Sequence, residues 1–298
     1  MKRIAAAVCA ASLLIAQPAY AQQDPALQQQ VSETERIAPA GEKVVIDHGH
    51  IDIGAIEVDG DFDLLARDDT EAHPVWRHLD DMVFKVSDAA LQTLPEDSTF
   101  EFTGAKAGDK VYVVPQSQIS GVPWIGWNSQ APSIQKVTDR GVTLELAGYQ
   151  GPGHFSLFLQ AGGVQKPQVI WDADEKGAQP MWVELNTHTH ANWVFTEPGV
   201  HQVAVRLKLP RTDGTEVETT RVLRFAVGDA SVAEAQKATF DGEMTASESG
   251  EEQAKGSANI GLIAGGVVAV IVVIAGAAVF MSRQSARRRA EAKNVANG

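Results

Sequence analysis

Cysteine is nearly absent from this chain. The single cysteine, Cys9, lies within an apolar N-terminal run and follows Val8 rather than the small residue that a lipoprotein signal places before its cysteine. We therefore expect Cys9 to be removed with the signal segment. A mature chain without cysteine has no disulfide bonds and no thiolate ligands, so any metal site must consist of histidine and carboxylate side chains.

Basic residues are also scarce. The 298 residues include 25 Lys and Arg against 38 Asp and Glu, which gives a formal net charge of −13. Because binding to nucleic acid depends on clustered positive charge, this composition argues against nucleic acid as a partner. An acidic exterior attracts cations, which suits metal capture, but it also simply keeps an exported protein soluble.

The sequence lacks recognisable catalytic groupings. No Ser-His-Asp or Cys-His pattern can be read from it. The cupin pattern, in which a glutamate follows a His-x-His unit by three or four residues, fails because Val194 and Phe195 occupy those positions. We therefore expect a binding protein and not an enzyme.

Long apolar runs are confined to the two ends of the chain. Lys2 and Arg3 precede the run Ile4 to Ala16, and Ala19-Tyr20-Ala21 has the small-x-small form that signal peptidase accepts. This pattern predicts a signal peptide over residues 1–21 and an exported protein.

The C-terminal run predicts a membrane anchor. Residues 260–280 are uncharged and apolar or glycine, and a helix of that length crosses a ~30 Å hydrocarbon core. The basic tail, residues 281–298, follows with Arg283 and Arg287 to Arg289, which the positive-inside rule places in the cytoplasm. We expect a single-pass type I protein of the cell membrane with its body outside.

Composition divides the chain between these ends into three parts. Residues 22–42 are polar, rich in glutamine and without apolar periodicity, which predicts a polar leader. Residues 229–259 are acidic and almost free of large apolar side chains, which predicts a flexible linker. Residues 43–228 are left as the folded surface domain.

The pattern of the domain predicts an all-β fold, an Ig-like or jelly-roll-type β-sandwich. Short β-branched and aromatic segments recur between turn residues, and Asp59-Gly60 and Asp213-Gly214 are hairpin signals. Asp88 to Leu94 is the one segment expected to form a helical turn. The expected strands are 43–47, 51–58, 82–86, 99–103, 110–114, 142–146, 154–160, 169–171, 181–185, 192–196, 199–209 and 216–227.

Two His-x-His units are the strongest functional signal. His188 and His190 are two residues apart, so on a strand their imidazoles share a face, and His48 and His50 repeat the spacing with Asp52 at the same parity. Imidazole is a good ligand for Zn²⁺, but one unit supplies only two of the three or four ligands that a tight site needs. The alternative is that these histidines line the wet face of an antiparallel strand.

Several motifs taken together resemble the actinobacterial surface-anchored proteins that carry the choice-of-anchor M domain. Asn186 stands where that family usually has glycine, but asparagine also tolerates positive φ. The first histidine of the earlier pair, His48, is not part of the shared pattern. The motifs are Gly49-His50-Ile51-Asp52-Ile53-Gly54, Arg67-Asp68-Asp69-Thr70, Val75-Trp76-Arg77, Gly121 to Trp127, Gly151-Pro152-Gly153, and His188 to Trp193 with Thr196-Glu197-Pro198-Gly199.

The resemblance implies a role beside ABC transporters of the metal-uptake type, in zinc or manganese acquisition. Two hypotheses follow. In the first, the protein is a metal-binding accessory protein, with Asn192 and Trp193 shaping the surroundings of the ligands. In the second, it is a structural or adhesive surface module whose histidines only form hydrogen bonds. The candidate metal ligands, with Zn²⁺ as the expected ion, are His188, His190, His50, His154, His48 and Asp52.

Overall fold

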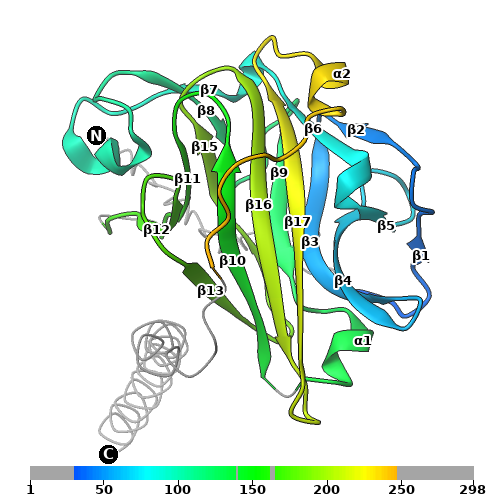
Figure 1. Cartoon of the computed structure of the whole chain (residues 1–298). Helices are drawn as coiled ribbons and strands as arrows, with labels where there is room; N and C mark the ends of the chain where they lie inside the picture. Colours follow the sequence, from blue (N-terminus) through cyan, green and yellow to red (C-terminus); the bar gives the residue numbers. More distant parts are fainter. Residues whose placement is uncertain (1–29, 139, 162–164, 247–298) are drawn as a thin grey trace, which may run out of the picture.

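The computed structural model describes residues 30–138, 140–161 and 165–246 of the chain (Figure 1). Within these ranges strands dominate, and they form three sheets of six, six and five strands with only short helical turns between them. This architecture confirms the all-β prediction. We name the sheets A, B and C.

Sheet A positions the residues of the candidate site. Its strand order is β1-β5-β4-β3-β9-β14. The strand β9 lies between β3, with which it pairs parallel, and β14, with which it pairs antiparallel. The strands of sheet A are β1 (Arg36–Ile37), β3 (Gly49–Val58), β4 (Asp61–Asp68), β5 (Val75–His78), β9 (Pro123–Asn128) and β14 (His188–His190).

Sheets B and C complete the body. Sheet B has the order β13-β10-β16-β17-β6-β2, with β2 (Val44–Ile46), β6 (Met82–Val86), β10 (Gly141–Gln150), β13 (Gln179–Glu184), β16 (Gly199–Pro210) and β17 (Glu216–Val227). Sheet C has the order β12-β11-β15-β8-β7, with β7 (Leu91–Thr93), β8 (Lys110–Val114), β11 (Phe155–Leu159), β12 (Gln168–Asp172) and β15 (Asn192–Phe195).

One hydrophobic core joins the three sheets. Phe225 on β17 of sheet B packs against Phe195 and Trp193 on β15 of sheet C, with ring centroids 4.9 and 6.0 Å apart. Ile53 and Trp127 of sheet A belong to the same core. Burial of these large side chains between the sheets is the main source of stability, and sheet B lies over sheets A and C (Figure 1).

Both predicted hairpins are present. Asp59 and Gly60 have φ of 52° and 94°, so both central residues of the β3–β4 turn are left-handed, as a type I′ turn requires. The second signal, Asp213-Gly214, joins β16 and β17, which pair from Gly199↔Val227 to Pro210↔Glu216. These two turns set the register of the longest strand pairs.

Two local predictions differ from the structure. The segment predicted as a strand at 99–103 is the 3-10 helix η4 (Ser98–Thr103), because the Asp97 carboxylate accepts a hydrogen bond from Thr99 N and Gly104, with φ of 76°, ends the turn. The predicted helical turn at 88–94 is helical only over η3 (Asp88–Ala90) and continues as β7. The remaining short helices are η2 (Leu79–Asp81), α1 (Pro132–Gln135) and α2 (Val232–Ala235).

The folded part extends beyond both boundaries expected from composition, 43 and 228. The strand β1 lies within the predicted leader and pairs with β5. After β17, α2 and the chain up to residue 246 lie along sheet B, where Thr245 N donates to Ala147 O at 2.8 Å and Gln202 Nε2 donates to Ala238 O at 3.3 Å. Hydrogen bonds to sheet B therefore order a segment whose few apolar side chains had predicted a flexible linker.

The predicted signal peptide, the span 260–280 and the basic tail lie outside the described residues. Within the described ranges, the structure has no helix of the length and apolarity needed to cross a membrane.

Candidate metal centre

The strand β9 brings the two pairs of ligands to one face of sheet A. In the pairing of β9 with β3, Asp52 is opposite Gly126 and His50 is opposite Trp124. In the pairing of β9 with β14, the same Gly126 is opposite His190. Residues directly opposite one another share a face of the sheet. Asp52, Gly126 and His190 therefore form one row across three strands, with His50 and His188 two residues away along β3 and β14.

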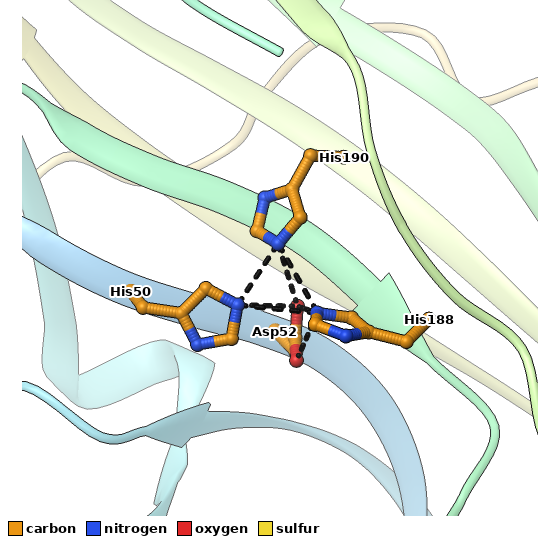
Figure 2. Close-up of side chains that lie close together, drawn as sticks. All are labelled: His50, Asp52, His188 and His190. Atoms are coloured by element: carbon orange, nitrogen blue, oxygen red, sulfur yellow. Dashed lines mark hydrogen bonds and ion pairs between the residues drawn. The ribbon is translucent and has the colours of Figure 1, made fainter. Parts of the chain in front are cut away.

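The four side chains converge on a common point (Figure 2). The Nε2 atom of His50 lies 2.9 Å from that of His190 and 3.1 Å from that of His188, and the latter two are 3.1 Å apart. Asp52 Oδ1 lies 3.1 Å from His188 Nε2 and 3.6 Å from the Nε2 atoms of both His50 and His190. The two His-x-His units thus contribute to one cluster, although 138 residues separate His50 from His188.

The cluster is buried. The exposed fractions of the side chains are 0% for Asp52, 2% for His190, 4% for His188 and 7% for His50. A buried carboxylate surrounded by imidazoles is costly unless its charge is compensated. These values contradict the alternative in which the histidines line a wet face.

The distances fit a tetrahedral ion. For bonds of about 2.0–2.1 Å, the ligand atoms of tetrahedral Zn²⁺ are about 3.3–3.4 Å apart. The six distances among the three Nε2 atoms and Asp52 Oδ1 range from 2.9 to 3.6 Å. An octahedral or square-planar ion would place at least one of these pairs on opposite sides, about 4 Å apart. The donor set and its shape therefore fit Zn²⁺.

The three contacts between the Nε2 atoms cannot all be hydrogen bonds. Each Nε2 atom either carries a proton or offers a lone pair. With three nitrogens, at least two must both be donors or both be acceptors. Those two repel each other at 2.9–3.1 Å. A cation at the centre converts all three contacts into ligand bonds, provided that each ring is neutral and turns its lone pair inward.

Surrounding residues hold the ligands in place. The Nδ1 atom of His50 lies 2.9 Å from both carboxylate oxygens of Asp69, which is the usual outer partner of a metal-binding imidazole. The ring of Trp124 stacks on His190 with centroids 4.0 Å apart and planes inclined by 17°. Asn128 Nδ2 donates to Asp52 Oδ2 at 3.3 Å. Each of these contacts restricts a ligand to an orientation that points into the cluster.

Burial and charge together set the protonation of the cluster. Burial lowers the pKa of His190 to about 3, although the Asp52 carboxylate acts in the opposite direction. Burial also acts to lower the pKa of His50, but the hydrogen bond to Asp69 and the charge of Asp52 outweigh it, and the net pKa is raised. The pKa of Asp52 is lowered despite its burial, because the hydrogen bond to His188 and the neighbouring imidazoles favour the carboxylate.

Two of the predicted ligands lie outside this cluster. His48 is 70% exposed and contacts Asp47, because Gly49 has φ of 88° and interrupts the strand alternation that would have aligned His48 with His50. His154 precedes β11 of sheet C, and its Nε2 atom lies 2.7 Å from Asp172 Oδ1 and 3.7 Å from Asp174 Oδ2 in a separate group.

The residues around the ligands also differ from those expected. Asn192 Oδ1 accepts a hydrogen bond from Gln116 N, and Trp193 donates to Ile125 O on β9. The ligands are instead supported by Asp69, Trp124 and Asn128. Strand parity could have suggested Trp124 and Asn128, which flank Gly126 at two-residue spacing, but only with knowledge that β9 lies beside β3.

Comparison of the chain with protein-family profiles, with curated proteins and with solved structures found no match.

Proposed function

We propose that this protein binds Zn²⁺ at the cluster of His50, Asp52, His188 and His190 and serves as a membrane-anchored accessory protein outside the cell. The observation that carries the proposal is the convergence of three buried Nε2 atoms within 3.1 Å of one another beside a fully buried carboxylate. With four protein ligands and little exposure, the site has the character of a closed zinc site, which holds the ion rather than exposing it to a substrate.

The cellular setting of the proposal comes from the sequence. The signal peptide, the span 260–280 and the basic tail would place an all-β body of Ig-like or jelly-roll type on the outer side of the membrane. The resemblance to choice-of-anchor M proteins supports an ABC uptake system for zinc or manganese as the partner. Between these two ions, the ligand geometry favours zinc, because manganese prefers octahedral sites rich in oxygen ligands.

Metal titration of the full-length protein tests this function. Wild-type protein freed of metal should bind one equivalent of Zn²⁺, measured by competition with a chromophoric chelator. The double variant His188→Ala, His190→Ala should keep its far-UV circular dichroism spectrum and lose the binding. The variants His48→Ala and His154→Ala are matched controls, because they remove histidines that lie outside the cluster, and both should bind as the wild type does.

A folded, metal-free wild type that takes up no Zn²⁺, Mn²⁺ or Cu²⁺ at neutral pH would contradict the proposal. That result would leave the structural or adhesive surface module as the better account of the protein.

A further inference from the structure

A chain of buried ionic contacts leads from the cluster to the N-terminal segment, which we define as residues 30–42. The Nδ1 atom of His50 contacts Asp69, and Asp69 Oδ2 accepts a hydrogen bond from Arg67 Nη1 at 3.1 Å. The other side of the same guanidinium forms a two-pronged contact with Glu35, at 2.9 Å from Nε and 2.8 Å from Nη2. Glu35 also accepts a hydrogen bond from Trp76 Nε1 at 3.0 Å.

These groups are shielded from solvent. The side chains of Arg67 and Glu35 are 4% and 9% exposed, and that of Asp69 is 19% exposed. Ionic contacts at such depth are screened much less than contacts on the surface. A change in the orientation of the His50 ring therefore acts on Asp69, Arg67 and Glu35 in turn.

The N-terminal segment has other polar contacts besides those of Glu35: Gly41 N donates to Asp81 Oδ2 at 2.7 Å, and Glu33 pairs with Lys136 at 2.7 Å. Most of its residues are exposed, β1 has only two residues, and a cleft of about 330 Å³ lined by Thr34, Glu35 and His73 separates part of it from the loop before β5. Glu42 also binds an arginine of the sheet, Arg77, whose Nη1 lies 2.9 Å from the Glu42 carboxylate.

Glu42 provides an internal comparison because its chain of contacts ends elsewhere. Arg77 Nε donates to Asp68 Oδ2 at 2.7 Å, and Asp68 Oδ1 accepts hydrogen bonds from the backbone and side chain of Thr70. Asp68 and Asp69 are adjacent in sequence, yet only Asp69 contacts a metal ligand. Two acid–arginine pairs thus join the segment to sheet A, and only the Glu35–Arg67 pair leads to the cluster.

We propose that Glu35 positions His50 through Arg67 and Asp69, so that binding of Zn²⁺ at the cluster and docking of the N-terminal segment stabilise each other. This inference rests on the proposed function. Coupling between two binding equilibria is reciprocal, so whatever factor the docked segment adds to metal affinity, the metal adds to docking. The loaded and empty proteins would then present different surfaces to a membrane partner.

Zinc titration of charge-neutral variants of the full-length protein tests the coupling. Asp69→Asn should weaken Zn²⁺ binding by about 10–100-fold, as is usual for the outer partner of a ligand histidine, and Glu35→Gln by about 3–10-fold because Glu35 lies two contacts further from His50. Glu42→Gln, the matched control, should leave Zn²⁺ affinity unchanged. Adding Glu35→Gln to Asp69→Asn should cause no further loss of Zn²⁺ affinity, since Asp69→Asn already removes the charged contact between His50 and Arg67.

Hydrogen exchange measures the effect of Zn²⁺ on docking of the N-terminal segment. The Ala38 amide, which donates to Trp76 O at 2.8 Å, should exchange more slowly in the presence of Zn²⁺ in the wild type and in Glu42→Gln, but not in Asp69→Asn. Equal Zn²⁺ affinities for Glu35→Gln and the wild type, or equal losses in Glu35→Gln and Glu42→Gln, would overturn the coupling alone. A wild type that binds no Zn²⁺ would overturn the proposed function itself.

Discussion

Gly126 is the residue that gives the ligands room to meet. A Cβ atom at this position would lie 2.5 Å from Thr189 O and 2.8 Å from both Asp52 Oδ1 and His190 Cε1. Two of these neighbours belong to ligands, so relief of the overlap must displace the site. We predict that Gly126→Ala abolishes tight Zn²⁺ binding and lowers the melting temperature, as measured by chelator competition and thermal unfolding.

Gly177→Ala is the control for this substitution. Gly177 has φ of 99°, and a Cβ atom there would have no neighbour within 4 Å. The Gly177→Ala variant strains the backbone but crowds no residue of the cluster. The Zn²⁺ affinity of this variant should therefore equal that of the wild type. A Gly126→Ala variant that binds Zn²⁺ normally would show that the cluster does not need the close approach of β9 and β14.

Residue types and spacing predicted the four residues that meet in the cluster but could not exclude the other two candidates. The i, i+2 spacing of His50 with Asp52 and of His188 with His190 implied shared faces, and those faces meet. His48 has the same spacing from His50, but the left-handed φ of Gly49 breaks the alternation. Asp69 escaped detection because nothing in the sequence distinguishes it from Asp68 beside it.

At the scale of elements, the junction of β14 and β15 divides the residues of the cluster from residues of the hydrophobic core. The strand β14 carries two ligands in sheet A, and after Ala191 the chain enters sheet C as β15. The change of sheet explains why His190 belongs to the cluster whereas Trp193, three residues later, lies in the hydrophobic core.

Trp193 connects sheet C to β9, the strand that lies between β3 and β14. It is 1% exposed, donates to Ile125 O of β9 at 3.2 Å, and has ring centroids 6.0 Å from those of Phe155, Trp171 and Phe225. Loss of a large buried aromatic side chain costs about 3–5 kcal/mol. We predict a destabilisation of that size for Trp193→Ala in chemical unfolding.

Trp182→Ala is the matched comparison for Trp193→Ala. Trp182 is only partly buried on β13, under the guanidinium of Arg140, so its loss should cost distinctly less. Equal costs for the two variants would mean that the contacts of Trp193 across the sheets contribute little.

The strand β9 shows which elements sequence patterns do not reveal. Hairpins such as β3–β4 and β16–β17 are predictable because turn residues and alternation lie within a few positions of one another. The parallel pairing of β3 with β9 joins residues more than 70 positions apart, and no local pattern encodes its register. The meeting of the two His-x-His units depends on that pairing, so their convergence required the structure.

At the scale of the whole molecule, two networks of buried charged groups lie in different sheets among the described residues. One surrounds the metal cluster in sheet A. The other lies on sheet B, where Glu145 is paired with Arg206 and Lys208, and Arg206 Nη2 donates to Thr245 O at 2.6 Å in the segment after α2. Both networks contact a segment outside the domain boundaries expected from composition: the N-terminal segment at sheet A and residues 236–246 at sheet B.

Buried histidines in different parts of the body should make stability depend on pH. Burial lowers the pKa of His190 to about 3 and that of His201, which lies beside Tyr149, to about 4. In the unfolded chain both titrate near 6.5, so below that pH the unfolded state binds more protons than the folded state. Their contribution to stability is complete above pH 6.5 and is lost as the pH falls toward 4.

We predict that the free energy of unfolding of the metal-free protein falls between pH 6.5 and 5, by up to about 1.4 kcal/mol per pH unit for each of the two histidines. His50 acts in a different range: its raised pKa stabilises the folded state fully below pH 6.5, and that contribution is lost only as the pH rises above 6.5. Chemical unfolding of the wild type from pH 5 to 8 measures the slope.

The contributions of His190 and His201 to the pH dependence can be distinguished by adding Zn²⁺ and by replacing His201. Zn²⁺ at 100 times its dissociation constant should add about 2.7 kcal/mol at neutral pH, and this gain should shrink below pH 6.5 as protons compete for the ligand rings. His201 is not in the cluster, so His201→Gln should flatten the slope of the metal-free protein while leaving the gain from Zn²⁺ intact. A slope unchanged in His201→Gln would assign the acid sensitivity to the metal cluster alone, and a gain from Zn²⁺ that persists undiminished at pH 5 would show that the ion is not held by imidazoles.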